Sequence, residues 1–171
     1  KHKVERTKGN RKMILENKKI KQALEYIKEE DPATTQDTLN MCQIPAPSYK
    51  EEKKAEYIRE RFREIGLRDV RIDAVGNVLG IWPGTGEGPS VMLAAHTDTV
   101  FPEGTDLTIR KEGNRYYCPG INDDTHAVAE MIAVAKAMIH ADLHTKGDLI
   151  FCANVCEEGL GDLYGNRKSP L

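Results

Sequence analysis

Apolar side chains recur every three or four positions over residues 14–30, which predicts an amphipathic helix. Its predicted buried stripe is Ile20, Leu24 and Ile27. Asp31-Pro32 should end this helix, because a residue before proline avoids the helical region of backbone space. A shorter helix is expected over 34–42, and the proline-rich stretch 44–47 reads as an extended connector.

A second amphipathic helix is expected after this connector. Ser48 and Glu51 have the spacing of a capping box, in which two side chains satisfy the free amides at a helix start. Gly66 is a typical stop residue. The predicted buried stripe is Ala55, Ile58, Phe62 and Ile65.

Beyond Gly66 the period becomes that of strands. Residues 70–73 alternate in polarity, Gly76-Asn77 marks a turn, and 78–82 reads as the partner strand. Two short apolar runs, 91–95 and 149–155, predict strands that are buried on both faces.

A hairpin and a long helix lie between these two runs. The hairpin is expected over 107–118, turning at 112–114, and the helix over 125–142. The core stripe of that helix is predicted to be Val128, Met131, Ile132, Ala135, Met138 and Ile139. Helices that alternate with apolar strands indicate the α/β class, with a layered sheet.

Composition and charge narrow the range of functions. The 171 residues are 39% hydrophobic and 30% charged, with a net charge of −2. No apolar run approaches the roughly 18 residues of a membrane span, and no signal-peptide core follows the start, so we expect a cytoplasmic protein without membrane contact. Residues 1–12 form a basic arm. Since no aromatic or glycine-rich pattern accompanies it, a disordered, solvated end is favoured over nucleic-acid binding.

The four cysteines are expected to be reduced and mostly buried. Cys152 and Cys156 fall on a predicted strand, where four residues span about 13 Å. A disulfide needs Cα atoms within roughly 7 Å, so this pair is not expected to form one.

Histidine and acidic residues follow the predicted strands in three clusters. His96-Thr97-Asp98 follows the run 91–95, Asp123-Asp124 precedes the long helix, and Glu157-Glu158 follows the run 149–155. Alone, each has an ordinary structural explanation: a hydrogen-bonded histidine, a helix cap or a solvated loop. Together they converge where α/β sheets bind ligands, and a cation would relieve their mutual repulsion. Imidazole with carboxylates suits zinc.

Longer motifs around these clusters resemble one family. The motifs are Ala95-His96-Thr97-Asp98-Thr99-Val100, Pro119-Gly120-Ile121-Asn122-Asp123-Asp124-Thr125 and Cys156-Glu157-Glu158-Gly159. They are similar to the co-catalytic di-zinc hydrolases, which include peptidase T, carboxypeptidase G, acetylornithine deacetylase and succinyl-diaminopimelate desuccinylase. The likeness covers about residues 35–165 and implies a layered α/β/α catalytic domain for 13–171.

The resemblance implies a role for each residue. His96 would bind one zinc, Glu158 would bind the second, and Asp123 would bridge both. Asp98 would orient the imidazole of His96, and Glu157 would be the general base. A cis peptide is implied between Asp123 and Asp124.

The resemblance also implies a zinc metallopeptidase or amidohydrolase, of exopeptidase type, in which Co²⁺ or Mn²⁺ could replace Zn²⁺. Its substrates would be small peptides or N-acyl amino acids, and the full-length protein would form a homodimer. The alternative is a truncated, non-catalytic relative that acts as a binding or subunit module.

Three departures from the family pattern stand out. The family supplies a later acidic ligand, a final histidine and a lid or dimerisation domain, none of which is found after Glu158; Asp162 follows it too closely. We therefore expect only the N-terminal portion of the catalytic domain, with two protein ligands for each zinc. Ala127 and Cys156 stand where glycine is common in the family.

His140 and His144 have the spacing of a metal-binding pair on a helix, but an interaction with the end of the helix is favoured.

Overall fold

The N-terminal helices differ in detail from the sequence prediction. The computed structural model describes residues 14–168, so the basic arm 1–12 lies outside the described residues. Helix α2 (Lys18–Glu29) begins after Asn17, whose side chain accepts hydrogen bonds from the amides of Lys19 and Ile20. Its buried face centres on Ala23, and the predicted core residue Leu24 is 44% exposed.

Helix α3 (Asp31–Cys42) starts three residues earlier than predicted. The predicted break at Asp31-Pro32 is present, but it separates two helices without a loop. Proline lacks an amide proton, and the first turn of a helix needs none, so Pro32 can lie inside the start of α3.

Helix α4 (Glu52–Glu64) buries Ala55, Ile58 and Phe62 as predicted. It ends before Gly66, whose φ of +89° fits the left-handed conformation typical of a helix stop. The predicted capping box is wrong, because α4 begins after Glu51 without a side-chain cap. Ser48 and Glu51 instead bond to distant loops, as described below.

The main sheet has the strand order β1-β2-β6-β3. Strands β1 (Arg68–Ile72), β2 (Val78–Trp82) and β6 (Leu149–Asn154) pair in antiparallel fashion, while β3 (Val91–His96) runs parallel to β6. The central strand β6 is buried, as predicted. Within the described residues β3 is an edge strand. Val91 is 53% and Leu93 37% exposed, so the prediction that β3 is buried on both faces is wrong.

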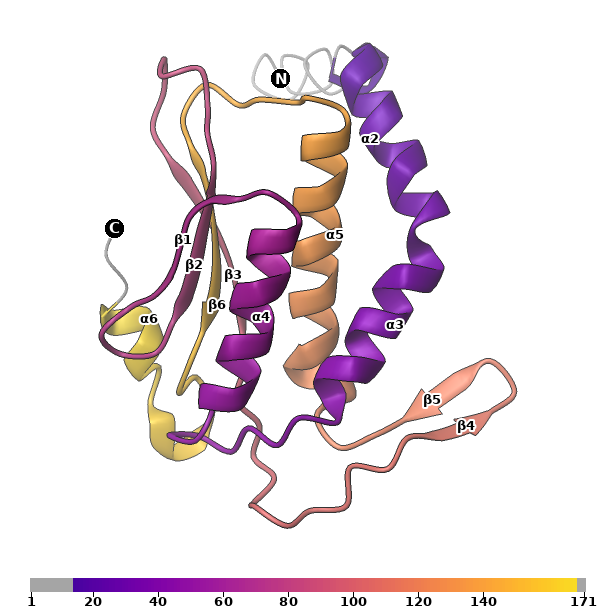
Figure 1. Ribbon diagram of the computed structural model, residues 1–171, viewed down its shortest axis with the longest axis vertical. Helices are drawn as coiled ribbons and strands as arrows, with labels where there is room; N and C mark the ends of the chain where they lie inside the picture. The colour runs from indigo at the N-terminus through magenta and orange to yellow at the C-terminus, as the bar shows by residue number, and fades with distance from the viewer. Residues whose placement is uncertain (1–13, 169–171) are drawn as a thin grey trace, which may run out of the picture.

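The long helices lie on one side of this sheet (Figure 1). α4 contacts β1 and β2, α5 (His126–His140) contacts β3 and β6, and α2 and α3 pack against the outside of α5. The short α6 (Tyr164–Lys168) lies on the opposite side. The α/β class is confirmed.

A two-stranded hairpin projects from the body, as predicted. It consists of β4 (Arg110–Glu112) and β5 (Arg115–Tyr117), and leads into a distorted turn, η1 (Ile121–Thr125), directly before α5. A second short turn, η2 (Gly159–Gly161), follows β6. Among residues 14–168, none of the helices combines the length and the hydrophobicity that a membrane span requires. None of the four cysteines forms a disulfide, and three of them are buried, as predicted.

Candidate metal centre

The parallel pairing of β3 with β6 brings the first and third clusters together. His96 is the last residue of β3 and lies opposite Asn154, the last residue of β6. The chain continues from both strands at the same edge of the sheet, so the loop after His96 lies beside the loop that carries Glu157 and Glu158. The amide of Thr97 donates to the carbonyl of Asn154 at 2.8 Å and continues this pairing by one residue.

The imidazole of His96 is nearly buried and has polar neighbours at both ring nitrogens. Nδ1 lies 3.0 Å from the carbonyl oxygen of Asp98 and 3.5 Å from its carboxylate. Nε2 lies 3.1 Å from Asp123 Oδ1 and 3.9 Å from Glu157 Oε2. Nδ1 is therefore the nitrogen that is fixed by the protein, and Nε2 is the nitrogen that faces the acidic groups.

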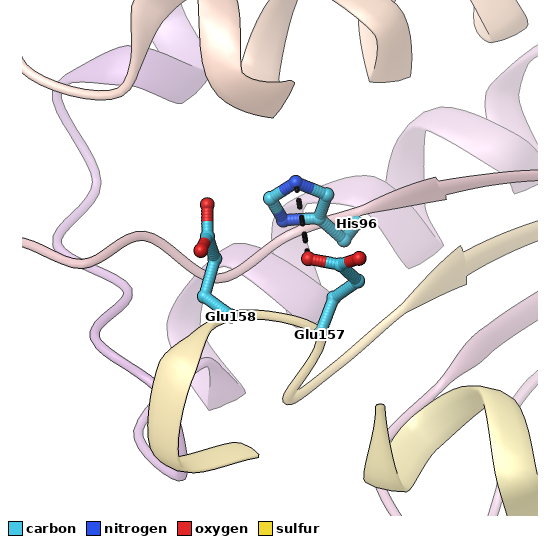
Figure 2. Close-up of side chains that lie close together, drawn as sticks. All are labelled: His96, Glu157 and Glu158. Carbon is cyan, nitrogen blue, oxygen red and sulfur yellow. Dashed lines mark ion pairs between the residues drawn. The ribbon is translucent and has the colours of Figure 1, made fainter. Parts of the chain in front are cut away.

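Glu157 and Glu158 extend from one loop toward this ring (Figure 2). One ligand atom from each of His96, Glu157 and Glu158 can be chosen so that all three lie within 4.8 Å of one another. With Asp123 beside His96, the donors are one imidazole nitrogen and three carboxylates, which are donor types that bind zinc in proteins. The residues present therefore fit a zinc ion.

Asp98 is completely buried and is tied to the loop of the two glutamates. Its carboxylate accepts hydrogen bonds from the hydroxyl of Ser48 at 2.6 Å and from the amides of Glu157 and Glu158 at 2.9 and 3.0 Å. Burial raises the pKa of Asp98, but His96, Ser48 and the two amides outweigh burial and lower that pKa to about 2. Asp98 thus anchors the glutamate loop as a carboxylate, in addition to lying beside His96.

The second cluster joins the site through η1. The peptide bond between Asp123 and Asp124 is cis, as the family resemblance implied. Asp123 reaches Nε2 of His96, whereas Asp124 accepts a hydrogen bond from the main-chain amide of His96 at 3.1 Å. Burial raises the pKa of Asp124. The two neighbouring aspartates therefore hold the ring and the backbone of the same histidine.

The electrostatics of the site favour positive charge. Burial lowers the pKa of His96, but Asp98, Asp124 and Asp123 outweigh it and raise that pKa to about 9. Burial and the nearby Asp123 raise the pKa of Glu158. Carboxylates that gather around one imidazole without enough cations repel one another, and a divalent ion would remove that cost.

All five predicted site residues come together, but the sequence did not indicate two residues that hydrogen-bond to them. His96, Asp98, Asp123, Glu157 and Glu158 meet where β3 and β6 end. Ser48 and Asp124 were not assigned to the site. The Ser48–Glu51 spacing indicates a local helix start, and no sequence pattern links it to a loop 50 or more residues away.

The remaining histidines have other partners. The ring of His140 stacks on Tyr26 at 4.2 Å, and the ring of His144 stacks on Trp82 at 4.6 Å. They do not form a metal group within the described residues. His126 lies 3.2 Å from the hydroxyl of Thr38 and 3.2 Å from the carboxylate of Glu130.

Comparison with known proteins agrees with the motifs and the fold. Residues 92–168 match the family described as "Peptidase family M20/M25/M40". Over these residues the chain is similar to this family. A protein of Pyrococcus abyssi named as a LysW-lysine/LysW-ornithine hydrolase is 35% identical over 119 residues, which is 70% of this chain and 32% of that protein. The succinyl-diaminopimelate desuccinylase of Corynebacterium glutamicum is 30% identical over 75% of this chain and 34% of its own length.

A solved structure supports the fold. The di-peptidase Dug1p of Saccharomyces cerevisiae superposes with a TM-score of 0.69 and 18% identity, over 81% of this chain and 35% of that protein. The chain thus spans about a third of the length of the relatives that it matches. The matched residues 92–168 include nearly all of β3, the whole of β6 and the three loops that carry the candidate site.

Proposed function

We propose that the protein to which this chain belongs hydrolyses peptide or amide bonds with the help of a divalent metal. The observation that carries the proposal is the arrangement of His96, whose Nδ1 is held by Asp98 while its Nε2 faces Asp123 and Glu157. The named activities of the relatives support it, since a desuccinylase and a di-peptidase both cleave amide bonds.

Zinc is the metal that we propose, with Co²⁺ or Mn²⁺ as substitutes. His96 would hold one ion and Glu158 a second, and Asp123 would contribute to both. When bound, zinc lowers the pKa of water toward about 7 and neutralises charge that develops on the amide oxygen. Asp98 would keep the imidazole in the tautomer that leaves Nε2 free for metal.

Glu157 is the residue that we assign as the general base. Its Oε2 lies 3.9 Å from Nε2 of His96, and its main-chain amide donates to Asp98 at 2.9 Å. From this position it would accept a proton from the attacking water and deliver it to the leaving amine. No serine or cysteine nucleophile is needed for this reaction. Small peptides and N-acyl amino acids are the proposed substrates.

The experiment is a hydrolysis assay with added Zn²⁺ on a panel of dipeptides and N-succinyl or N-acetyl amino acids. The variant Glu157→Gln keeps the size of the side chain and removes the base. We expect it to lose about 100-fold or more of the rate while it still binds zinc. Full activity in Glu157→Gln would remove Glu157 from the base role. Zinc binding without hydrolysis of any substrate would favour the alternative, a non-catalytic binding module.

A further inference from the structure

The segment from Ser48 to Lys54 contacts all three loops of the candidate metal centre. The hydroxyl of Ser48 donates to Asp98 Oδ2 at 2.6 Å, in the loop that follows β3. Glu51 Oε1 accepts from the amide of Cys156 at 3.0 Å, in the loop that carries the two glutamates. Lys54 Nζ lies 3.4 Å from the hydroxyl of Thr125, in η1 beside the aspartates.

These three residues are three positions apart, and they lie where the chain enters α4. The connector before them is itself fixed to the His96 loop, since Pro47 pairs with Thr99 and the amide of Thr99 donates to Ala46 at 2.8 Å. One continuous stretch of chain therefore runs alongside the site and sends a side chain to each of its loops.

Glu51 and Lys54 are buried although both are charged, with exposures of 4% and 2%. Their neighbours Glu52 and Lys53 are the same residue types and are exposed to solvent. Burial raises the pKa of Glu51 and lowers the pKa of Lys54, so each charge opposes folding into this place. Charged groups are rarely kept in such positions unless their contacts serve a purpose.

We propose that Ser48, Glu51 and Lys54 are positioning residues that hold the three ligand-bearing loops in one arrangement. None of them is among the proposed ligands. They act through Asp98, Cys156 and Thr125, each of which adjoins or supports a proposed ligand. The inference rests on the proposed function in one respect: the three loops are taken to share a single metal centre.

The consequence is that metal affinity depends on residues that do not touch the metal. Side chains that orient metal ligands typically change the affinity by about 10- to 100-fold when they are removed. Glu51→Ala removes the acceptor of the Cys156 amide, and Lys54→Met removes the donor to Thr125 while it fills the same space without a buried charge. Both should therefore weaken metal binding.

The test is a titration of the 171-residue chain with Co²⁺, in which binding is measured by the visible absorption of the bound ion, on the wild type and five variants. Glu51→Ala and Lys54→Met are compared with the adjacent surface changes Glu52→Ala and Lys53→Met, which make the same change of residue type. We expect the first two to bind Co²⁺ at least about 10-fold more weakly and the two controls to match the wild type. Glu51→Gln should restore most of the affinity, because its Oε1 still accepts from Cys156.

Amide hydrogen exchange by NMR gives a readout that is independent of the metal. Glu51→Ala should speed exchange at Cys156, whereas the amides of β6 keep their protection. A Co²⁺ affinity within twofold of the wild type in both buried variants would overturn the inference, and so would equal losses in Lys53→Met. If the wild-type chain binds no Co²⁺, the proposed metal site fails. In that case unchanged exchange at Cys156 overturns the positioning role, and faster exchange there supports it.

Discussion

The pair of His96 and Asp98 should make the stability of the metal-free chain depend on pH in a defined window. The folded-state pKa of His96 is raised from 6.5 to about 9. A histidine with a raised pKa stabilises the fold fully below its unfolded pKa, and this contribution is lost as the pH rises through the folded pKa. The window therefore runs from about pH 6.5 to about pH 9.

The size of this effect follows from the shift. The rise in the pKa of His96 from 6.5 to about 9 corresponds to about 3 kcal/mol of unfolding free energy, at about 1.4 kcal/mol for each pKa unit. The perturbation is Asp98→Asn, which has nearly the same shape but no charge. Asp98 is the group that raises the pKa of His96 most. Between pH 6.5 and 9 the variant should therefore lose roughly half as much stability as the wild type.

The assay is urea unfolding in EDTA at pH 6, 7, 8 and 9.5, for wild type and variant. The difference between the two curves isolates the pair, because other titrating groups are common to both. We expect the variant to be less stable at pH 6, since the amides of Glu157 and Glu158 and the hydroxyl of Ser48 lose a charged acceptor. Parallel curves, with the same loss of stability from pH 6 to 9.5, would refute the reasoning.

Three further predictions concern the fold. Phe62→Ala should cost about 3–5 kcal/mol of unfolding free energy in a denaturant titration, whereas Leu24→Ala should cost below about 1 kcal/mol, because Phe62 is fully buried and Leu24 is 44% exposed. Leu93→Lys should change stability by about 0.5 kcal/mol or less in the same titration, since β3 is an edge strand; a loss of several kcal/mol would contradict the strand order. Gly120→Ala should lower the melting temperature more than Gly104→Ala; both glycines have positive φ, but only at Gly120 would a Cβ meet another side chain, Thr99 Cγ2, at 2.6 Å.

The helices of the core could be predicted because their burial follows a local period. Ile58 and Phe62 lie one turn apart on one face of α4, and the sequence alone places both on the same side. Leu24 was misassigned because α2 packs on α5 through the small Ala23, and a periodic pattern does not show which part of an apolar face meets its neighbour.

The edge position of β3 could not be predicted for a different reason. The run from Val91 to Ala95 is uniformly apolar, and such a run does not reveal how many strands lie beside it. Burial of a strand depends on sheet order, which is set by contacts between distant segments. The same limit explains why Leu93 is partly exposed although its position in an apolar run predicts that it is buried.

The site residues could be identified from three local motifs, yet their supports could not. Ser48 and Glu51 were assigned to a helix cap because their spacing fits that local role. In the structure, the hydroxyl and the carboxylate bond instead to Asp98 and Cys156, which are 50 and 105 positions away. A competing long-range hydrogen bond has no signature in a single sequence.

The central claim is that His96 and the acidic residues around it form a divalent metal site. The most direct measurement is calorimetric titration of the chain with Zn²⁺, comparing wild type, His96→Ala and His126→Ala. His126 is the matched control, because it lies near the start of α5 and contacts Thr38 and Glu130. We predict that His96→Ala weakens zinc binding at least about 10-fold and that His126→Ala leaves it unchanged. Equal zinc affinity in wild type and His96→Ala would contradict the account.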